Sequence, residues 1–274
     1  MALSRYRLNH VRAMAAIGAV FVGLVSGAAF SGCGGGGRVE LVLYCAAGIR
    51  QAMAPVIEAF EAKHAISVRT TYEGSGQLLG KIAAGAAGDL FMPGATFYVD
   101  KAADKGLVDP ASRRTVGYFV PVLFVAKGNP LGLKTLHDLA RKGVRVGLGD
   151  ERSAAIGEAS LALFKKNDIP YDQVAPNVVY KSGTVNELGV AIQMHTVDAA
   201  IVWDVNARQF AAYGDTVAIP PGENVVSTVP IVVLKTSAHP AEAMKFIEFV
   251  TSPEGKRILA ENGVTVSLQE DPHE

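Results

Sequence analysis

The sequence predicts an α/β protein of two lobes. Two blocks, residues 39–92 and 133–203, alternate short β-branched apolar runs with amphipathic stretches of helical spacing. Two long extended runs follow these blocks at 115–126 and 225–234, and two amphipathic helices after Pro240 end the pattern. Two blocks joined by two extended runs indicate a double crossover, in which the C-terminal helices complete the first lobe. The pattern alone also fits one large α/β domain.

The first block predicts three strands with two helices between them. The strands are the apolar or β-branched runs at 39–45, 67–72 and 89–92. The first helix carries one apolar stripe at helical spacing, made of Ile49, Met53, Val56, Ile57 and Phe60. The second helix opens at the Gly-Ser-Gly sequence of 74–76. This order of elements is typical of a parallel, doubly wound sheet.

The second block repeats the alternation after Asn129-Pro130. Helices are predicted at 133–142, 154–167 and 184–195, and strands at 144–148, 177–180 and 199–203. The predicted division of the chain is an export signal at 1–32, a glycine-rich tether at 33–38, a first lobe at 39–118, a second lobe at 119–230, and a return to the first lobe at 231–274.

The N-terminus has the features of an export signal. Three arginines (Arg5, Arg7 and Arg12) precede an apolar run over 13–30, which is shorter than the roughly 20 residues of a membrane-spanning helix. The sequence Phe-Ser-Gly-Cys at 30–33 resembles the site that is cleaved before a lipid-modified cysteine. We therefore expect a lipid on Cys33, which tethers the protein to the membrane. An ordinary cleaved signal or an uncleaved anchor are the alternatives, and all three place the protein in the periplasm or on the outer face of the cytoplasmic membrane.

Charge and cysteine content exclude several classes of protein. The chain has 26 basic and 26 acidic side chains, which indicates neither a nucleic-acid surface nor a basic membrane-binding face. Loss of residues 1–32 removes three arginines and no acid, so the remainder has 23 basic against 26 acidic groups. An anion site in this chain must therefore work by local geometry. Cys45 is expected to be a small buried apolar residue without a disulfide.

Four strand-to-helix junctions are candidate ligand sites. In open α/β sheets, ligands bind beyond the carboxyl ends of the strands, where the unpaired amides of helix N-termini attract anions. Ser75 is the most informative residue, because its flanking glycines let the backbone turn tightly and expose amides. Its hydroxyl either caps the helix or donates to an anion. The four junctions are 46–48, 74–76, 149–157 and 182–185.

No motif of an enzyme is present in the sequence. It has no paired cysteines, no His-Glu-x-x-His, no phosphate-binding loop that ends in Gly-Lys-Ser/Thr, and no Gly-x-Ser-x-Gly. The six histidines are scattered. We therefore expect a binding protein without catalytic residues, metal ligands or a cofactor.

At these junctions the chain resembles the molybdate/tungstate-binding proteins of ABC importers. The resemblance covers about 39–264 and is strongest at 43–60, 74–91, 146–157 and 185–203. Leu-Gly-Lys-Ile at 79–82 and Gly-Ala-Ala-Gly-Asp-Leu-Phe at 85–91 look like the family's second helix and the strand after it. It implies the two-lobed periplasmic-binding-protein fold (type II), in which each lobe is a mixed, mostly parallel sheet flanked by helices. It also implies a monomer that binds molybdate or tungstate between its lobes and delivers it to an ABC transporter permease.

The resemblance assigns five ligand-binding residues. Members of this family hold the oxyanion by hydrogen bonds alone. Ser75 matches the serine of the second loop, and backbone amides at Ile156 and Val185 match the third and fourth contacts. Gly48 stands where the family has a serine, and Trp203 where it often has a tyrosine hydroxyl.

Two alternatives remain open at the level of the sequence. The same fold accepts another small solute, such as sulfate, phosphate or an organic acid. Acidic side chains near the predicted cleft would repel an anion and suit a different solute; they are Asp150, Glu151 and Asp204. The other alternative is an extracytoplasmic sensor or scaffold lipoprotein that binds no transported solute.

Overall fold

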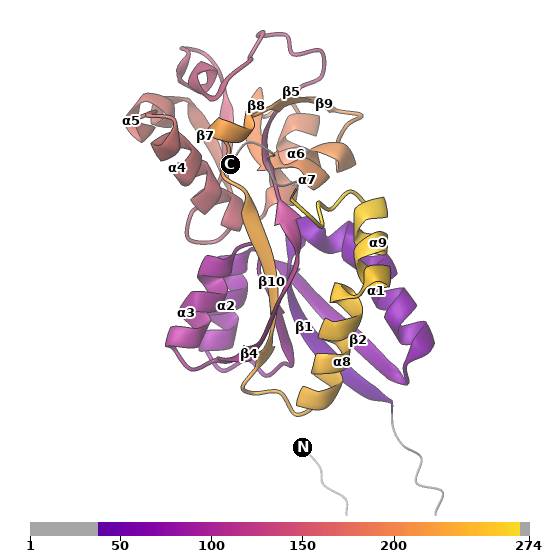
Figure 1. The fold of residues 1–274 in the computed structure, drawn as a ribbon. Coiled ribbons are helices and arrows are strands. Elements are labelled where there is room, and N and C mark those ends of the chain that lie inside the picture. The colour runs from indigo at the N-terminus through magenta and orange to yellow at the C-terminus, as the bar shows by residue number, and fades with distance from the viewer. Residues whose placement is uncertain (1–37, 269–274) are drawn as a thin grey trace, which may run out of the picture. The chain divides into compact units, whose positions relative to one another are not determined.

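The computed structural model describes residues 38–268 and contains two five-stranded sheets. The predicted export signal, most of the tether and Cys33 lie outside the described residues. Within 38–268, no helix is both long and apolar enough to cross a membrane. The prediction of two α/β lobes, each a mixed sheet flanked by helices, is confirmed (Figure 1).

The first lobe is built on the sheet with strand order β2-β1-β3-β10-β4. Its strands are β1 (Val39–Ala46), β2 (Ile66–Glu73), β3 (Leu90–Met92), β4 (Val108–Phe119) and β10 (Ser227–Leu234). β1 pairs in parallel with β2 and β3, whereas β10 runs antiparallel between β3 and β4. Helices α2 (Ser75–Ala83) and α3 (Thr96–Asp104) cover one face. The other face packs against α1 (Arg50–Lys63), α8 (Pro240–Thr251) and α9 (Pro253–Glu261) (Figure 1).

The second lobe is built on the sheet with strand order β7-β6-β8-β5-β9. Its strands are β5 (Pro121–Ala126), β6 (Val146–Gly149), β7 (Val178–Ser182), β8 (Ala199–Trp203) and β9 (Gly214–Ala218). β6 is parallel to β7 and β8, and β5 is antiparallel to β8 and β9. The sheet is flanked by α4 (Ala155–Lys166), α5 (Tyr171–Val174), α6 (Val185–Gln193) and α7 (Asp204–Gln209).

Two chain crossings connect the lobes. The extended run predicted at 115–126 is two strands in different sheets, because β4 ends at Phe119, β5 begins at Pro121, and only Val120 lies between them. The chain returns between β9 and β10, so the second extended run belongs to the first sheet from Ser227 onward. Figure 1 shows β4 and β10 side by side along this connection.

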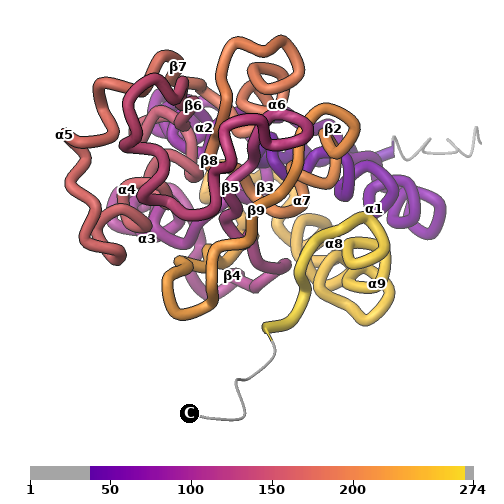
Figure 2. Tube along the Cα trace, turned by 90° about the horizontal axis from the view of Figure 1, so that it is seen from above, coloured from indigo at the N-terminus to yellow at the C-terminus, as the bar shows by residue number. Residues whose placement is uncertain are grey.

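The C-terminal helices complete the core of the first lobe. α9 packs on both α8 and α1, and Figure 2 shows the three helices together. Phe60 of α1 is fully buried, and its ring meets Phe246 of α8 edge to face with centroids 5.0 Å apart. Cys45 of β1 is buried as predicted, and its burial raises the pKa of the thiol well above its ordinary value.

The helix predicted at 133–142 is instead a short 3-10 helix, Leu136–Ala140. The buried leucines of this segment stand three residues apart, at Leu133, Leu136 and Leu139. That spacing matches the 3.0 residues per turn of a 3-10 helix, which aligns side chains at i and i+3. The sequence prediction also omitted α3, α7 and β9, which have nine, six and five residues.

Replacement of Phe60 by alanine is expected to lower the free energy of unfolding by about 3–5 kcal/mol, because it opens a cavity between α1 and α8. The matched control is Phe97→Ala on α3, whose side chain is exposed, with an expected loss of about 0.5 kcal/mol or less. Urea denaturation of both variants measures the difference. Equal losses would contradict a core that depends on the C-terminal helices.

Candidate functional site

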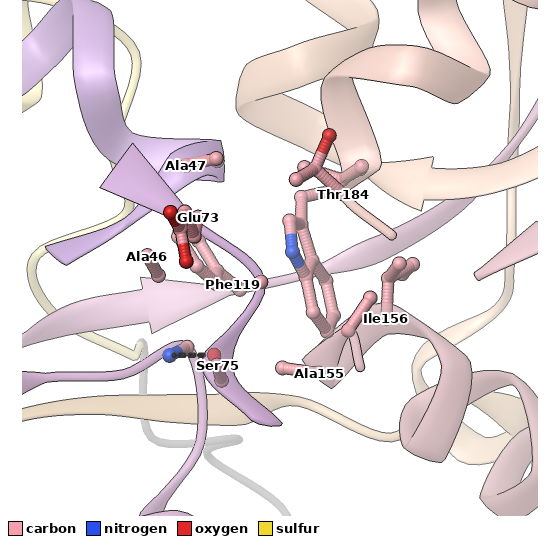
Figure 3. Close-up of a pocket in the computed structure, with 14 residues that line it drawn as sticks. Ala46, Ala47, Glu73, Ser75, Phe119, Ala155, Ile156 and Thr184 are labelled. Atoms are coloured by element: carbon pink, nitrogen blue, oxygen red, sulfur yellow. Dashed lines mark hydrogen bonds between the residues drawn. The ribbon is translucent and has the colours of Figure 1, made fainter. Parts of the chain in front are cut away.

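A small pocket lies where the two lobes meet. Figure 3 shows Ala46, Glu73 and Ser75 of the first lobe on one side, and Ile156 and Thr184 of the second lobe on the other. Strands β1 and β2 end at it, and the helix starts that follow β6 and β7 reach it from the other lobe. The lining residues are Ala46, Ala47, Gly48, Glu73, Gly74, Ser75, Gly94, Phe119, Ala154, Ala155, Ile156, Thr184, Val185 and Trp203.

The structure brings all five sequence-predicted site residues to this pocket. Gly48, Ser75, Ile156, Val185 and Trp203 each line it, although they come from different junctions of two lobes. Their role as ligand contacts stays a prediction. Within the described part of the chain, no lysine or arginine lines the pocket, and no cluster of His, Cys, Asp or Glu could hold a metal ion.

Ser75 is the first residue of α2 and does not cap it. The N-cap position belongs to Gly74, whose amide donates to Gln77 Oε1 at 3.1 Å. The Ser75 hydroxyl oxygen accepts a hydrogen bond from the Gly94 amide at 2.9 Å, drawn as a dashed line in Figure 3. Because this bond uses only the oxygen, the hydroxyl proton remains available to donate into the pocket.

The flanking glycines do not act as the sequence predicted. Gly74 has φ −66° and ψ 145°, which any residue adopts, so a tight turn does not require glycine there. The Gly76 amide does not face a ligand, because it donates to the Ser153 carbonyl oxygen at 2.8 Å. The expected role of these glycines, a tight turn with exposed amides, is therefore not what the structure shows at Gly74 and Gly76, whose amides are bonded within the protein.

On the second lobe, the first turns of α4 and α6 face the pocket. Before α4, the amides of Ser153 and Ala154 donate to the Asp150 carbonyl oxygen, which organises the loop that precedes Ile156. Before α6, the Thr184 hydroxyl donates to Glu187 Oε1 at 3.0 Å and the Gly183 amide donates to Glu187 Oε2 at 3.1 Å, while the Thr184 side chain makes no capping bond to the helix. These bonds hold the first-turn residues Ile156 and Val185 in place at the pocket wall.

Gly48 and Trp203 are in contact across the lobes. The Trp203 indole is 2% exposed and stacks on Phe119, with ring centroids 5.0 Å apart. A Cβ on Gly48 would lie 3.0 Å from Val185 Cγ1 and 3.1 Å from Trp203 Cδ1. Asn206 Oδ1 would lie 3.2 Å from the same Cβ, so a side chain at position 48 would require these neighbours to shift by a few tenths of an ångström.

Comparisons with known proteins place the chain in a family. Residues 41–265 match the model of the bacterial extracellular solute-binding proteins. The chain belongs to this family. It is 29% identical over 224 residues to a Haemophilus influenzae protein named only as a binding protein, a match that covers 82% of this chain and 90% of the relative. It is 28% identical over 230 residues to a molybdate-binding protein of Mycobacterium tuberculosis, with coverage of 83% and 85%.

A solved structure agrees with the fold. The periplasmic molybdate-binding protein of Azotobacter vinelandii superposes with a TM-score of 0.74 at 20% identity, over 83% of this chain and all of that one. Family membership makes the chain a solute-binding protein and not an enzyme, as the sequence predicted. The predicted resemblance to molybdate-binding members is likewise confirmed.

Two polar residues of this solute-binding protein escaped the sequence prediction. Glu73 lines the pocket, and its carboxylate accepts a hydrogen bond from Lys81, which forms an ion pair with it. Its position just before the Gly-Ser-Gly sequence is a signal that could have identified it. Asn206 of α7 is buried and donates to the Gly48 carbonyl oxygen at 3.1 Å, so it joins the lobes. Nothing local in the sequence marks that contact.

The acidic residues suspected from the sequence lie outside the pocket. Asp150, Glu151 and Asp204 are absent from its lining. Glu151 pairs with Lys181 at 2.9 Å. Asp204 is adjacent to the lobe crossing, and its Oδ2 accepts from Arg208 at 3.2 Å and from the Thr265 hydroxyl at 3.4 Å. Of the acidic side chains, Glu73 alone lines the pocket among the residues that the structure describes.

The two aspartates have opposite pKa shifts. Burial raises the pKa of Asp204, the opposing influence of Arg208 does not cancel it, and Oδ1 has no hydrogen-bond partner within 38–268. Burial also raises the pKa of Asp150, but hydrogen bonds from Ser153 and Arg152 outweigh it and leave the pKa below its ordinary value. A carboxyl group whose pKa is higher in the folded state than in the unfolded state stabilises the fold at pH values below its unfolded-state pKa. This stabilisation is lost as the pH rises through its folded-state pKa. A lowered pKa has the reverse effect.

Asp204→Asn is therefore expected to raise the temperature of unfolding at about pH 7, because the amide avoids an ionised buried carboxylate. The gain should shrink as pH falls toward the ordinary aspartate value of 3.8. Asp150→Asn is the control with the opposite sign, since it should lower the unfolding temperature at neutral pH and have less effect in acid. Thermal unfolding followed by circular dichroism at several pH values tests both. A loss at neutral pH in Asp204→Asn would show that the Arg208 ion pair outweighs burial.

Proposed function

We propose that this solute-binding protein captures a small tetrahedral oxyanion, molybdate or tungstate, in the pocket between its lobes. The observation that carries this proposal is the convergence of four strand-to-helix junctions on one pocket whose lining, among the described residues, has no cationic side chain. Helix N-termini present unpaired amides and a partial positive charge. They suit an anion that is held by neutral hydrogen-bond donors.

Each lobe supplies a share of the contacts. In the first lobe, the Ser75 hydroxyl donates to an oxyanion oxygen while its own oxygen stays bonded to the Gly94 amide. In the second lobe, the amides of Ile156 and Val185 donate from the first turns of α4 and α6. Trp203 closes the wall beside Gly48, and its indole N–H is a further donor.

The charge of Glu73 opposes a dianion, and Lys81 offsets it. The lysine ammonium pairs with the carboxylate, so the pair brings little net charge to the rim of the pocket. Neutral donors then decide which anion binds. Similarity to molybdate-binding proteins supports molybdate or tungstate among the possible oxyanions.

Capture between lobes requires that they move. We propose that the first sheet with its helices forms one rigid body and the second sheet with its helices the other, and that they rotate about the two crossings to enclose the solute. The closed form then delivers the solute to the permease of an ABC importer. The export signal at 1–32 would direct the chain across the membrane and be removed, after which the tether at 33–38 and a lipid on Cys33 would hold the protein at the outer face of the membrane.

The first test is a titration of the full-length chain with molybdate, tungstate, sulfate and phosphate. Trp203 is the only tryptophan in the sequence and lines the pocket, so its fluorescence reports occupancy, and calorimetry gives the affinity. Molybdate or tungstate is expected to bind at micromolar concentration or below, about −8 kcal/mol or stronger, and to change the fluorescence. If only sulfate or phosphate bound, that anion would be the ligand in place of molybdate or tungstate. If none of the four anions bound, the proposal of an oxyanion site would be refuted.

Ser75→Ala is expected to weaken oxyanion binding by at least tenfold, because a hydrogen bond to a charged group contributes about 1.5–3 kcal/mol. The matched control is Ser112→Ala. Ser112 is also buried in the first lobe and also accepts a backbone amide bond at 2.9 Å, from Val233, but it does not line the pocket. The Ser112 hydroxyl also donates to the Asp109 carbonyl oxygen at 2.6 Å, so Ser112→Ala should lose at least as much stability as Ser75→Ala, whereas only Ser75→Ala should lose affinity. Unchanged affinity in Ser75→Ala would remove this residue from the site.

A further inference from the structure

The first turn of α2 touches the second lobe through backbone atoms. The Gly76 amide donates to the Ser153 carbonyl oxygen, in the loop before α4, at 2.8 Å. The second amide of a helix has no acceptor within its own helix. Gly76 therefore obtains its partner from the opposite lobe. This hydrogen bond links two segments that belong to different sheets, at the edge of the pocket.

No side chain fits at this contact. A Cβ on Gly76 would lie 1.8 Å from the Arg152 carbonyl oxygen, where real Cβ atoms essentially never come closer than 3.0 Å. A Cβ on Gly74 would lie 2.2 Å from the Gly183 carbonyl oxygen and 2.4 Å from that of Ser153. These obstacles are backbone atoms, so they cannot rotate away as a side chain can. With any larger residue at position 76, the lobes cannot meet in this arrangement.

The backbone of α2 does not itself require glycine at position 76. Gly76 lies inside the helix and is not among the residues with positive φ. Glycine is disfavoured in helices relative to alanine, because it loses more conformational freedom on folding. Gly80 of the same helix differs, since a Cβ there would meet nothing within 4 Å. Contact with the second lobe is therefore the physical reason for glycine at 76.

We propose that Gly76 is a positioning residue for solute capture. Its missing side chain permits the lobes to close over the pocket, and its hydrogen bond to Ser153 holds them closed. Gly76 does not line the pocket, so it acts on the solute only through closure. The inference rests on the proposed function, because it requires that a solute binds between the lobes. The contact between Gly76 and Ser153 does not itself require a bound solute.

This role predicts a kinetic signature. The apparent dissociation constant equals the intrinsic constant divided by the fraction of molecules that can close. A side chain at 76 leaves the first encounter of solute with one lobe intact, because the pocket lining is unchanged. It removes the closed state that retains the solute. The loss of affinity should therefore appear in the dissociation rate, with the association rate nearly constant.

The experiment compares Gly76→Ala with Gly80→Ala in the full-length chain, with molybdate as the probe and Trp203 fluorescence as the stopped-flow signal. Gly76→Ala is expected to bind about 100-fold more weakly through faster dissociation, since affinity scales with the closed fraction. Gly80→Ala should bind like the wild type, and both variants should retain full stoichiometry and a cooperative thermal transition. Wild-type kinetics in Gly76→Ala would overturn the inference and leave the proposed function standing.

A second measurement tests the contact between the lobes independently of whether the proposed ligand binds. If the wild type binds none of the oxyanions, hydrogen exchange at the residue 76 amide is measured without ligand. Protection in the wild type and in Gly80→Ala, together with fast exchange in Gly76→Ala, supports the contact between lobes. Equal exchange in all three proteins refutes it.

Discussion

The unpaired amides at the starts of helices are the constraint on which this structure depends. A helix leaves its first amides without internal partners, and a buried amide must find a partner in protein, water or ligand. Here the two sheets bring four such starts to one place. Some amides are satisfied within the protein, as at Gly74 through Gln77 and at Gly76 through Ser153. The first-turn residues Ser75, Ile156 and Val185 remain at the pocket wall, where a bound anion would complete them.

Much of the fold was predictable because its signals are local. Alternating apolar runs and helical stripes identified most of the long elements, and the rule that ligands bind at the carboxyl ends of strands brought residues as distant as Gly48 and Trp203 to one predicted cleft. The five site residues came from the resemblance to molybdate/tungstate-binding proteins, and all five line the pocket. Short elements were missed, since α7 and β9 offer too few residues for a periodic pattern. The leucines spaced by three at 133–139 were assigned the wrong kind of helix.

The remaining features depend on contacts that no local pattern encodes. A glycine in a Gly-Ser-Gly turn suggests backbone flexibility, yet the reason for Gly76 lies at Arg152, in the other lobe. The proximity of Trp203 to Gly48 becomes visible only in three dimensions. The hydrogen bond from Asn206 to the Gly48 carbonyl oxygen, 158 positions away in the sequence, is likewise a contact that no local pattern predicts. The strand-to-helix junctions could be predicted from the sequence, whereas the structure was needed to show which of their residues line the pocket and which join the two lobes.

The place of β10 in the first sheet has a consequence for how the chain folds. β10 begins at Ser227 but lies between β3 and β4, which end at Met92 and Phe119. Until β10 is inserted, β3 is an open sheet edge, and such edges favour wrong pairing with other chains. Contacts between residues so far apart in sequence form slowly, because a long loop must first be closed. The second sheet uses only residues 121–218, so its most distant pairings, of β5 with β8 and β9, close shorter loops than the pairing of β3 with β10. The lobe that starts first along the chain therefore needs the longer loop closure to complete its sheet.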